Sequence, residues 1–280
     1  MAVGRPRGDD PRTVVVLRAL GLGDLLTAVP ALRGLRRRFP RARLLLAAPR
    51  QYRALALLTG TLDEVIDTPA LGPIDEAPQE PDLAVNLHGR GPQSITALRA
   101  LNPAMLLTHH HEDHPDIPGP PWRQDLHEVD RWCALLQWTG IDCRVNDLRI
   151  DRPEGYQKNS DAVVIHPGAG APARQWPAHR YAAVAAALAE DGMRVVVTGS
   201  AAEADLVDEV VTEAGLPASA AWPASSDLLA LVALISDCRL LICGDTGVGH
   251  LATATGTPSV LLFGPTPPKQ WGPRGDGRHV

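Results

Sequence analysis

A glycine-rich turn near the C-terminus joins an apolar run to a helical pattern. The apolar run at residues 240–243 is typical of a buried strand, and the turn has the sequence Gly244-Asp245-Thr246-Gly247-Val248-Gly249-His250. Glycine lets the backbone approach a ligand closely, and the free N–H groups and dipole of a first helical turn favour negative charge. The turn therefore predicts a site for a phosphate or diphosphate. The same pattern also occurs in α/β proteins that bind no ligand there.

Short apolar runs and helical patterns alternate along the rest of the chain. Strands are expected at residues 14–17, 44–48, 64–67, 83–87, 162–166, 195–198, 240–243 and 259–263. Helices are expected at residues 25–38 (in spite of Pro30), 55–58, 126–138, 181–190, 203–214, 226–235 and 251–255. This alternation is typical of an α/β protein with mostly parallel sheets.

A polar stretch at residues 151–161 separates two such series. The length of 280 residues suits two domains of about 100–150 residues each. We therefore expect two Rossmann-like, doubly wound domains, at residues 1–155 and 156–280. Such sheets bind ligands at the carboxyl ends of their strands, so the two domains are expected to face each other across a cleft.

Charge argues against a nucleic-acid partner. The formal net charge is −5, and Lys158 and Lys269 are the only lysines. A local basic cluster is formed by Arg33, Arg36, Arg37, Arg38, Arg41 and Arg43. It is either a solvated helix face or a contact for an anionic membrane surface or a phosphorylated acceptor.

Cysteine usage and the N-terminus favour a soluble cytoplasmic protein. Cys133, Cys143, Cys238 and Cys243 contain no C-x-x-C pair, and the last two lie in apolar surroundings, which suits a reducing compartment. Residues 1–12 lack the apolar core of a signal peptide, and no segment has about 18 uninterrupted apolar residues. The inner face of the cell membrane is a second expected location.

Several segments, taken in order, carry a family resemblance. They are Leu17-Arg18-Ala19-Leu20-Gly21-Leu22-Gly23-Asp24 with Val29-Pro30-Ala31-Leu32, then His127-Glu128-Val129-Asp130-Arg131-Trp132, His166-Pro167-Gly168-Ala169, Arg174-Gln175-Trp176-Pro177, Gly199-Ser200-Ala201-Ala202-Glu203, Gly244-Asp245-Thr246-Gly247 through His250-Leu251, and Phe263-Gly264-Pro265-Thr266. The chain resembles glycosyltransferase family 9, the heptosyltransferase-like enzymes of the GT-B fold, which include those of lipopolysaccharide biosynthesis. The resemblance implies inverting, metal-independent transfer of a sugar, typically heptose from an ADP-linked donor, to a glycan or lipid-glycan acceptor.

The resemblance gives Asp24 the role of general base. Asp24 follows a Gly-x-Gly turn after the first strand, where its carboxylate is expected to project at the start of a helix. An acceptor hydroxyl needs a base within hydrogen-bond reach. The alternative is a helix N-cap. Gly23 beside it and His88 at the end of another strand are expected on the acceptor side; the alternative for His88 is a structural role.

On the donor side, a leaving nucleoside diphosphate needs fixed positive partners. Arg174 is the candidate, at a position where the family more usually carries lysine; the alternative is a surface arginine. The N–H groups of Thr246 and Gly247, with the Thr246 hydroxyl, are expected to hold the diphosphate.

Three further residues are candidates in the donor site. Asp245 either orders the turn or helps to place the sugar. His250 follows Thr246 by one helical turn and either returns to the same site or is a core histidine. Glu203 either accepts hydrogen bonds from ribose hydroxyls or is an acid in the first turn of a helix.

No metal or cofactor is expected besides the ADP-sugar donor substrate. A cluster consists of His109, His110, His111, Glu112, Asp113 and His114. Consecutive histidines do not fit one coordination face, and no D-x-D element is present to hold a nucleotide-bound cation.

The C-terminus departs from the family pattern. The chain ends fifteen residues after Pro265, whereas family members usually continue with several more segments, so the donor domain is expected to be truncated. Its tail, Trp271-Gly272-Pro273, has few apolar residues with which to dock. Two other functions therefore stay open: a nucleotide-sugar epimerase or hydrolase on the same fold, and a nucleotide-sugar-binding protein without catalysis.

Overall fold

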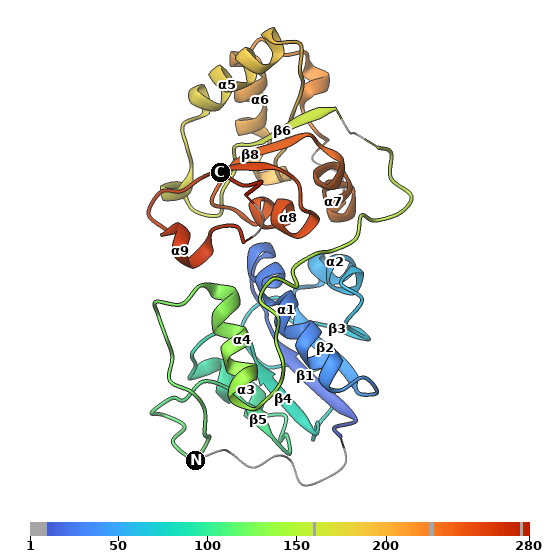
Figure 1. Cartoon of the computed structure of the whole chain (residues 1–280), viewed down its shortest axis with the longest axis vertical. Coiled ribbons are helices and arrows are strands. Elements are labelled where there is room, and N and C mark those ends of the chain that lie inside the picture. Colours follow the sequence, from blue (N-terminus) through green and yellow to red (C-terminus); the bar gives the residue numbers. More distant parts are fainter. Residues whose placement is uncertain (1–9, 159–160, 224–226, 275–276) are drawn as a thin grey trace. The chain divides into compact units, whose positions relative to one another are not determined.

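Two parallel sheets, one in each half of the chain, form the framework of the protein (Figure 1). The computed structural model describes residues 10–158, 161–223, 227–274 and 277–280. The chain divides into two compact units, Met1–Leu148 and Arg149–Val280, while the expected boundary lies at residue 155. Arg149 packs against Gly256, and the Ile150 N–H donates to the Ala254 carbonyl at 2.9 Å. These two residues thus belong to the C-terminal unit.

The N-terminal unit has a five-stranded parallel sheet in the order β3-β2-β1-β4-β5. Its strands are β1 (Thr13–Leu17), β2 (Arg43–Ala48), β3 (Glu64–Asp67), β4 (Leu83–Asn86) and β5 (Leu106–Leu107), and its helices are α1 (Leu22–Arg38), α2 (Arg53–Leu58), α3 (Gln93–Arg99) and α4 (Glu128–Trp138). β1 is central because Val15 pairs with Leu45 on one side and with Ala84 on the other. The strand order changes direction beside β1, which places a ligand-binding switch point at its carboxyl end.

The C-terminal unit has a four-stranded parallel sheet in the order β7-β6-β8-β9. Its strands are β6 (Ala162–His166), β7 (Arg194–Val197), β8 (Leu240–Gly244) and β9 (Ser259–Leu262), and its helices are α5 (Ala178–Glu190), α6 (Ala204–Glu213), α7 (Leu228–Asp237), α8 (Gly247–Thr255) and α9 (Pro268–Trp271). The switch point lies between β6 and β8, so the loops after these two strands meet at one edge of the sheet.

All eight expected strands are present, and most helices differ from expectation by a few residues. The expected start of α7 at Ser226 lies outside the described residues; the helix begins at Leu228 after the N-cap Asp227. Helix α8 begins at Gly247, earlier than expected, because its first turn is made of glycines that carry no helical pattern. The short elements α3, β5 and α9 were not predicted, since short segments have too few residues to show a period.

The C-terminal tail docks on the sheet although it has few apolar residues. The Ser259 N–H donates to the Arg278 carbonyl at 3.0 Å, and the Leu261 N–H donates to the Val280 carbonyl at 2.8 Å. The Trp271 ring meets the His250 ring edge to face at a centroid distance of 6.0 Å. Docking needs few apolar side chains here because backbone groups supply the contacts.

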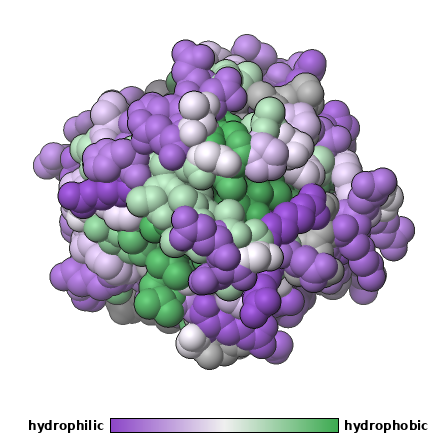
Figure 2. Space-filling model, turned by 90° about the horizontal axis from the view of Figure 1, so that it is seen from above, coloured by the Kyte–Doolittle hydropathy of each residue, from purple (hydrophilic) through white to green (hydrophobic). Residues whose placement is uncertain are grey.

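Cys133 and Cys143 form a disulfide that joins α4 to the following loop, a pairing that the sequence pattern did not predict. Cys238 and Cys243 are buried free thiols, as expected. Within the described ranges, no helix is both long and apolar enough to cross a bilayer. Seen from above, the protein has hydrophobic residues at the middle of the face and hydrophilic residues around them (Figure 2).

Gly34 tests the packing of α1 on α4. A Cβ at Gly34 would lie 2.8 Å from the Asp142 carbonyl oxygen and 3.3 Å from Leu136 Cδ1. We expect Gly34→Val to lower the free energy of unfolding by about 1–3 kcal/mol through overpacking. Gly72→Val is the control, because Gly72 has open space around its Cα and an ordinary φ. Equal urea midpoints for the two variants would show that α1 and α4 do not pack this closely.

Hydrogen exchange tests the tail pairing. In chains that lack residues 278–280, the amides of Ser259 and Leu261 lose their acceptors and should exchange faster. The Val260 amide is the internal control. Successive N–H groups along a strand point to opposite sides, so the Val260 N–H faces β8 while those of Ser259 and Leu261 face the tail. Unchanged protection of Ser259 and Leu261 would contradict the pairing.

Candidate active site

Asp24 lies in the first turn of α1, directly after the carboxyl end of β1. It is the third residue of the helix, and Gly21 is the N-cap, so the N-cap alternative is wrong. Its Oδ2 nevertheless accepts the Gly21 N–H at 3.2 Å, which caps the helix from inside. The carboxylate remains 27% exposed. Asp24 therefore combines a structural contact with a partly exposed side chain.

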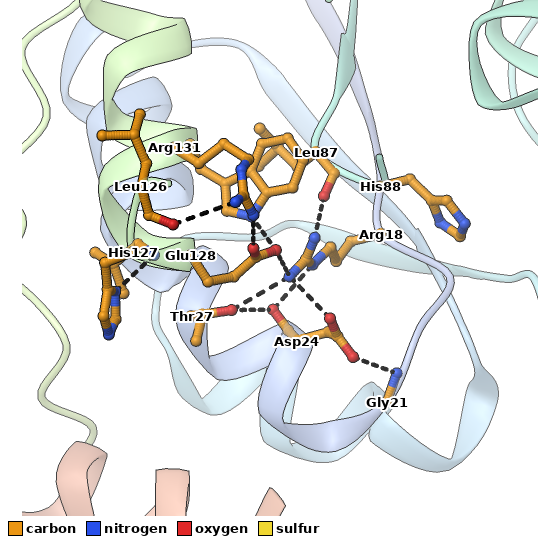
Figure 3. A network of polar contacts seen from close by, with 12 residues as sticks. Arg18, Gly21, Asp24, Thr27, Leu87, His88, Leu126, His127, Glu128 and Arg131 are labelled. Atoms are coloured by element: carbon orange, nitrogen blue, oxygen red, sulfur yellow. Dashed lines mark hydrogen bonds and ion pairs between the residues drawn. The ribbon is translucent and has the colours of Figure 1, made fainter. Parts of the chain in front are cut away.

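The Arg18 guanidinium holds both the backbone and the side chain of Asp24 (Figure 3). Arg18 is only 1% exposed. Its Nε donates to the Asp24 carbonyl at 2.9 Å, its Nη2 donates to Asp24 Oδ1 at 3.1 Å, and its Nη1 donates to the Leu87 carbonyl after β4. A buried guanidinium must have its N–H groups bonded, so Arg18 holds the backbone and the carboxylate of Asp24 in one geometry.

Helix α4 supplies the second acid beside Arg18. Glu128 Oε1 accepts from Arg18 Nη2 at 2.9 Å and from Trp132 Nε1 at 2.9 Å, and its Oε2 pairs with Arg131. Glu128 is 4% exposed. Arg18, Glu128 and Arg131 lie in two of the segments that carry the family resemblance, but no site role was predicted for them. The sequence does not show that these charged side chains are buried together, because they come from segments far apart in the chain.

Burial and two neighbouring charges shift the pKa of the Asp24 carboxyl. Burial raises its pKa, the Arg18 guanidinium lowers it, and the Glu128 carboxylate raises it again; the net result is a pKa above the usual value. A carboxylate with a raised pKa accepts a proton more readily. The site can therefore supply a general base.

Gly23 and His88 are the two residues expected on the acceptor side. Gly23 is the residue before Asp24 in the first turn of α1. The His88 N–H donates to Asn86 Oδ1 at 3.1 Å, and its Nδ1 is buried without a hydrogen-bond partner among the described residues. Burial and the Arg18 charge lower the pKa of His88 to about 4, which makes the ring neutral near pH 7. Figure 3 shows the ring pointing away from Arg18.

In the C-terminal unit, the predicted anion turn forms the start of α8. Thr246 is its N-cap in extended conformation, and its side chain makes no capping hydrogen bond. A pocket at this turn is lined by Gly244, Asp245, Thr246, Gly249, His250, Thr253, Leu261, Phe263, Trp271 and Pro273. The first hydrogen bond of α8 is donated by the Gly249 N–H to the Thr246 carbonyl at 3.0 Å, so the N–H groups of Gly247 and Val248 before it are the ones that can bind an anion.

Arg174 approaches this turn from the loop after β6. Its Nε lies 3.5 Å from Asp245 Oδ2, although the geometry is not that of a hydrogen bond. The Arg174 side chain is 43% exposed, whereas Asp245 is 6% exposed. Arg174 thus stands beside the predicted anion site with most of its hydrogen-bonding capacity available.

Two buried polar atoms at the same turn have no hydrogen-bond partner among the described residues. They are Asp245 Oδ2 and the Tyr181 hydroxyl, which lies 3.6 Å from the position of a Cβ on Gly244. The Arg174 carbonyl lies 3.1 Å from that same position, so a side chain at residue 244 would push the loop away. Buried polar atoms normally have partners. Unpaired ones beside an anion turn are typical of a ligand site.

Glu203 and His250 lie on different elements of the C-terminal unit. Glu203 Oε2 accepts the Ser200 N–H and hydroxyl, both at 2.8 Å, and its other oxygen lies against Gly168. Burial raises its pKa, but the Ser200 hydrogen bonds and His166 lower it below the usual value. Glu203 is therefore an acid in the first turn of a short helix, where it caps that turn. Its contact with Gly168 places it beside the loop after β6. His250 lines the pocket and touches Trp271.

Side chains of the histidine cluster pack on other rings, and those of the arginine cluster form ion pairs with carboxylates. His109 is buried edge to face against Trp122 at 5.0 Å, and in the described part of the chain no three His, Cys, Asp or Glu residues are arranged to hold a metal. Arg33 and Arg37 pair with Asp147, Arg36 with Asp63, Arg38 with Asp10 and Arg43 with Glu64. These carboxylates offset most of the positive charge, as in a solvated ion-paired face.

The chain is similar to known proteins in family, sequence and fold. The family model "Glycosyltransferase family 9 (heptosyltransferase)" matches residues 120–279. Lipopolysaccharide heptosyltransferase 2 of Escherichia coli K12 is 30% identical over 153 residues, which cover 52% of this chain and 41% of that protein. The chain thus matches less than half of the length of this curated relative.

Solved structures show the same fold over nearly the whole chain. A glycosyl transferase family 9 protein from Veillonella parvula superposes with a TM-score of 0.80 at 22% identity, over 97% of this chain and 85% of that one. The E. coli ADP-heptose lps heptosyltransferase II gives 0.78 at 21% identity, over 96% and 89%. The fold is therefore the α/β GT-B class, and the family model covers more than half of the chain. The chain belongs to glycosyltransferase family 9.

Proposed function

We propose that the chain is a glycosyltransferase that moves a heptose from an ADP-linked donor to a hydroxyl of a glycan or lipid-glycan acceptor. The observation that carries the proposal is the Asp24 carboxylate, which is partly exposed, has a raised pKa and is held by Arg18 at the switch point of its sheet. The donor and the kind of acceptor follow the E. coli relative, whose name specifies ADP-heptose and lipopolysaccharide.

The reaction is a single displacement. Asp24 takes the proton of the acceptor hydroxyl, whose oxygen attacks the anomeric carbon from the face opposite the diphosphate. The new glycosidic C–O bond forms as the C–O bond to the diphosphate breaks, and ADP leaves with the electron pair. One displacement inverts the anomeric configuration. Gly23 and His88 are proposed on the acceptor side, since neutral His88 can hydrogen-bond a hydroxyl.

The diphosphate is held by protein groups, without a metal. Arg174 and the N–H groups of Thr246 and Gly247 offset its charge, and the Thr246 hydroxyl is not engaged in capping. Asp245 Oδ2 and the Tyr181 hydroxyl, which make no hydrogen bond in the described part of the chain, are offered to the sugar or ribose. Glu203 and His250 complete the donor pocket. A lipid-linked acceptor would bring the enzyme to the cytoplasmic face of the membrane, with peripheral contact only.

Removal of the base tests the catalytic half of the proposal. We expect Asp24→Asn to lower kcat for transfer by about 10²–10⁴-fold, because general-base catalysis contributes about that much. The affinity for ADP should stay unchanged, because Asp24 does not lie in the donor turn. The readout is ADP release from ADP-heptose with a heptose-free lipopolysaccharide core as acceptor. Full activity of Asp24→Asn would show that Asp24 is not the general base.

Nucleotide titration tests the donor half. Calorimetry with ADP, UDP and GDP, with and without Mg²⁺, should show a preference for ADP that does not depend on the metal. Arg174→Ala should raise the Kd for ADP about 10–100-fold, the equivalent of about 1.5–3 kcal/mol for a hydrogen bond to a charged group. Arg194→Ala is the matched control, an exposed arginine at the start of β7. If no diphosphate binds, the donor assignment of Thr246 and Gly247 is wrong.

A further inference from the structure

Two carboxylates compete for one nitrogen of Arg18 (Figure 3). Arg18 Nη2 lies 3.1 Å from Asp24 Oδ1, 2.9 Å from Glu128 Oε1 and 3.2 Å from Thr27 Oγ1. This nitrogen has two N–H groups, so three acceptors share two donors. Glu128 makes the shortest of the three contacts. The Asp24 carboxylate therefore receives only part of the hydrogen bonding that a guanidinium can give.

Glu128 is locked in this position from its other side. Its Oε2 pairs with Arg131, and its Oε1 also accepts from Trp132. Arg131 in turn donates to the Leu126 carbonyl at 3.2 Å and stacks over the Trp122 ring at 4.4 Å. Glu128 thus cannot turn away from Arg18 without leaving a buried charge unpaired.

The charges alternate through the network, from Asp24 to Arg18 to Glu128 to Arg131. The last three are almost completely buried. Charges interact strongly where water is excluded. His88, which follows the Leu87 carbonyl bonded to Arg18, is neutral near pH 7 and adds no charge. The Arg18 and Glu128 charges are therefore the ones that act on the Asp24 carboxyl.

This inference rests on the proposed role of Asp24 as the base. We propose that Glu128 is a positioning residue that keeps Asp24 basic: it shares the Arg18 guanidinium, so that Arg18 fixes Asp24 in place without fully neutralising it. Arg131 supports the same role by holding Glu128. Neither Glu128 nor Arg131 touches the substrate.

The physical consequence follows from the sign of each charge. An adjacent guanidinium lowers the pKa of a carboxyl by about 1–3 units when nothing opposes it. The Glu128 carboxylate opposes it and raises the pKa of Asp24. Without the Glu128 charge, the pKa of Asp24 falls, so Asp24 stays ionised to lower pH but takes a proton less readily. The maximal rate then falls while the acid limb of the pH profile moves to lower pH.

A purely structural role gives a different result. If Glu128 only held α4 to the end of β1, its loss would reduce stability and activity without moving the titration of Asp24. Trp132→Phe provides the matched control, because it removes one hydrogen bond to Glu128 and leaves every charge of the network in place. We expect this variant to lose stability while the pKa of Asp24 stays at its original value.

The experiment is a carbon-13 NMR titration of aspartate carboxyl groups in the full chain, with the Asp24 signal assigned from Asp24→Asn. We expect Glu128→Gln to lower the pKa of Asp24 by about one unit or more. An unchanged or raised pKa would overturn the proposal. The acid limb of kcat/KM for transfer should move in the same direction.

A second variant guards against misfolding. Glu128→Gln leaves two buried guanidiniums short of a partner, whereas Glu128→Gln/Arg131→Gln removes one charge of each sign. The double variant should show the same fall in the pKa of Asp24, and a folded double variant with an unaltered pKa would also overturn the proposal. The titration does not depend on turnover. If Asp24→Asn keeps full activity, the base assignment fails even where the titration shifts as expected, so the two failures can be told apart.

Discussion

The buried guanidinium of Arg18 is the interaction on which the N-terminal unit depends. It contacts the Asp24 backbone and carboxylate at the start of α1, the Leu87 carbonyl after β4 and Glu128 on α4. A charge without water must have partners, so these elements cannot move apart without leaving Arg18 unsatisfied. The position of the proposed base is therefore a consequence of how the unit is held together, and its protonation depends on the same contacts.

The C-terminal unit uses the opposite arrangement at its own switch point. Its helix α8 begins without a side-chain cap, and the nearby side chains include Arg174 on the loop after β6. Gly244 lets that loop approach closely, because a Cβ there would lie 3.1 Å from the Arg174 carbonyl. One sheet thus presents a carboxylate at a helix start and the other presents a place for an anion. These features suit a base and a diphosphate respectively.

Several residues that the sequence marked as candidates also have structural tasks. Asp24 caps α1 through Gly21, and Glu203 caps a short turn through Ser200. Such double use is expected where a functional carboxylate lies at a helix start, since the free N–H groups that attract a ligand also attract an acidic side chain. The functional and structural alternatives for these residues are therefore not exclusive.

The sequence by itself determined the parallel α/β architecture, the positions of the eight main strands, the glycine-rich turn before α8 and the family resemblance. These follow from local patterns of apolar residues and glycines, which need no knowledge of distant neighbours. Only the tertiary structure decided which charges are paired. Arg18 and Glu128 lie 110 residues apart in the chain, and the arginines after Arg33 meet carboxylates from other segments. Burial and pairing depend on contacts between distant segments, so the environment of Asp24 emerges only when the chain has folded.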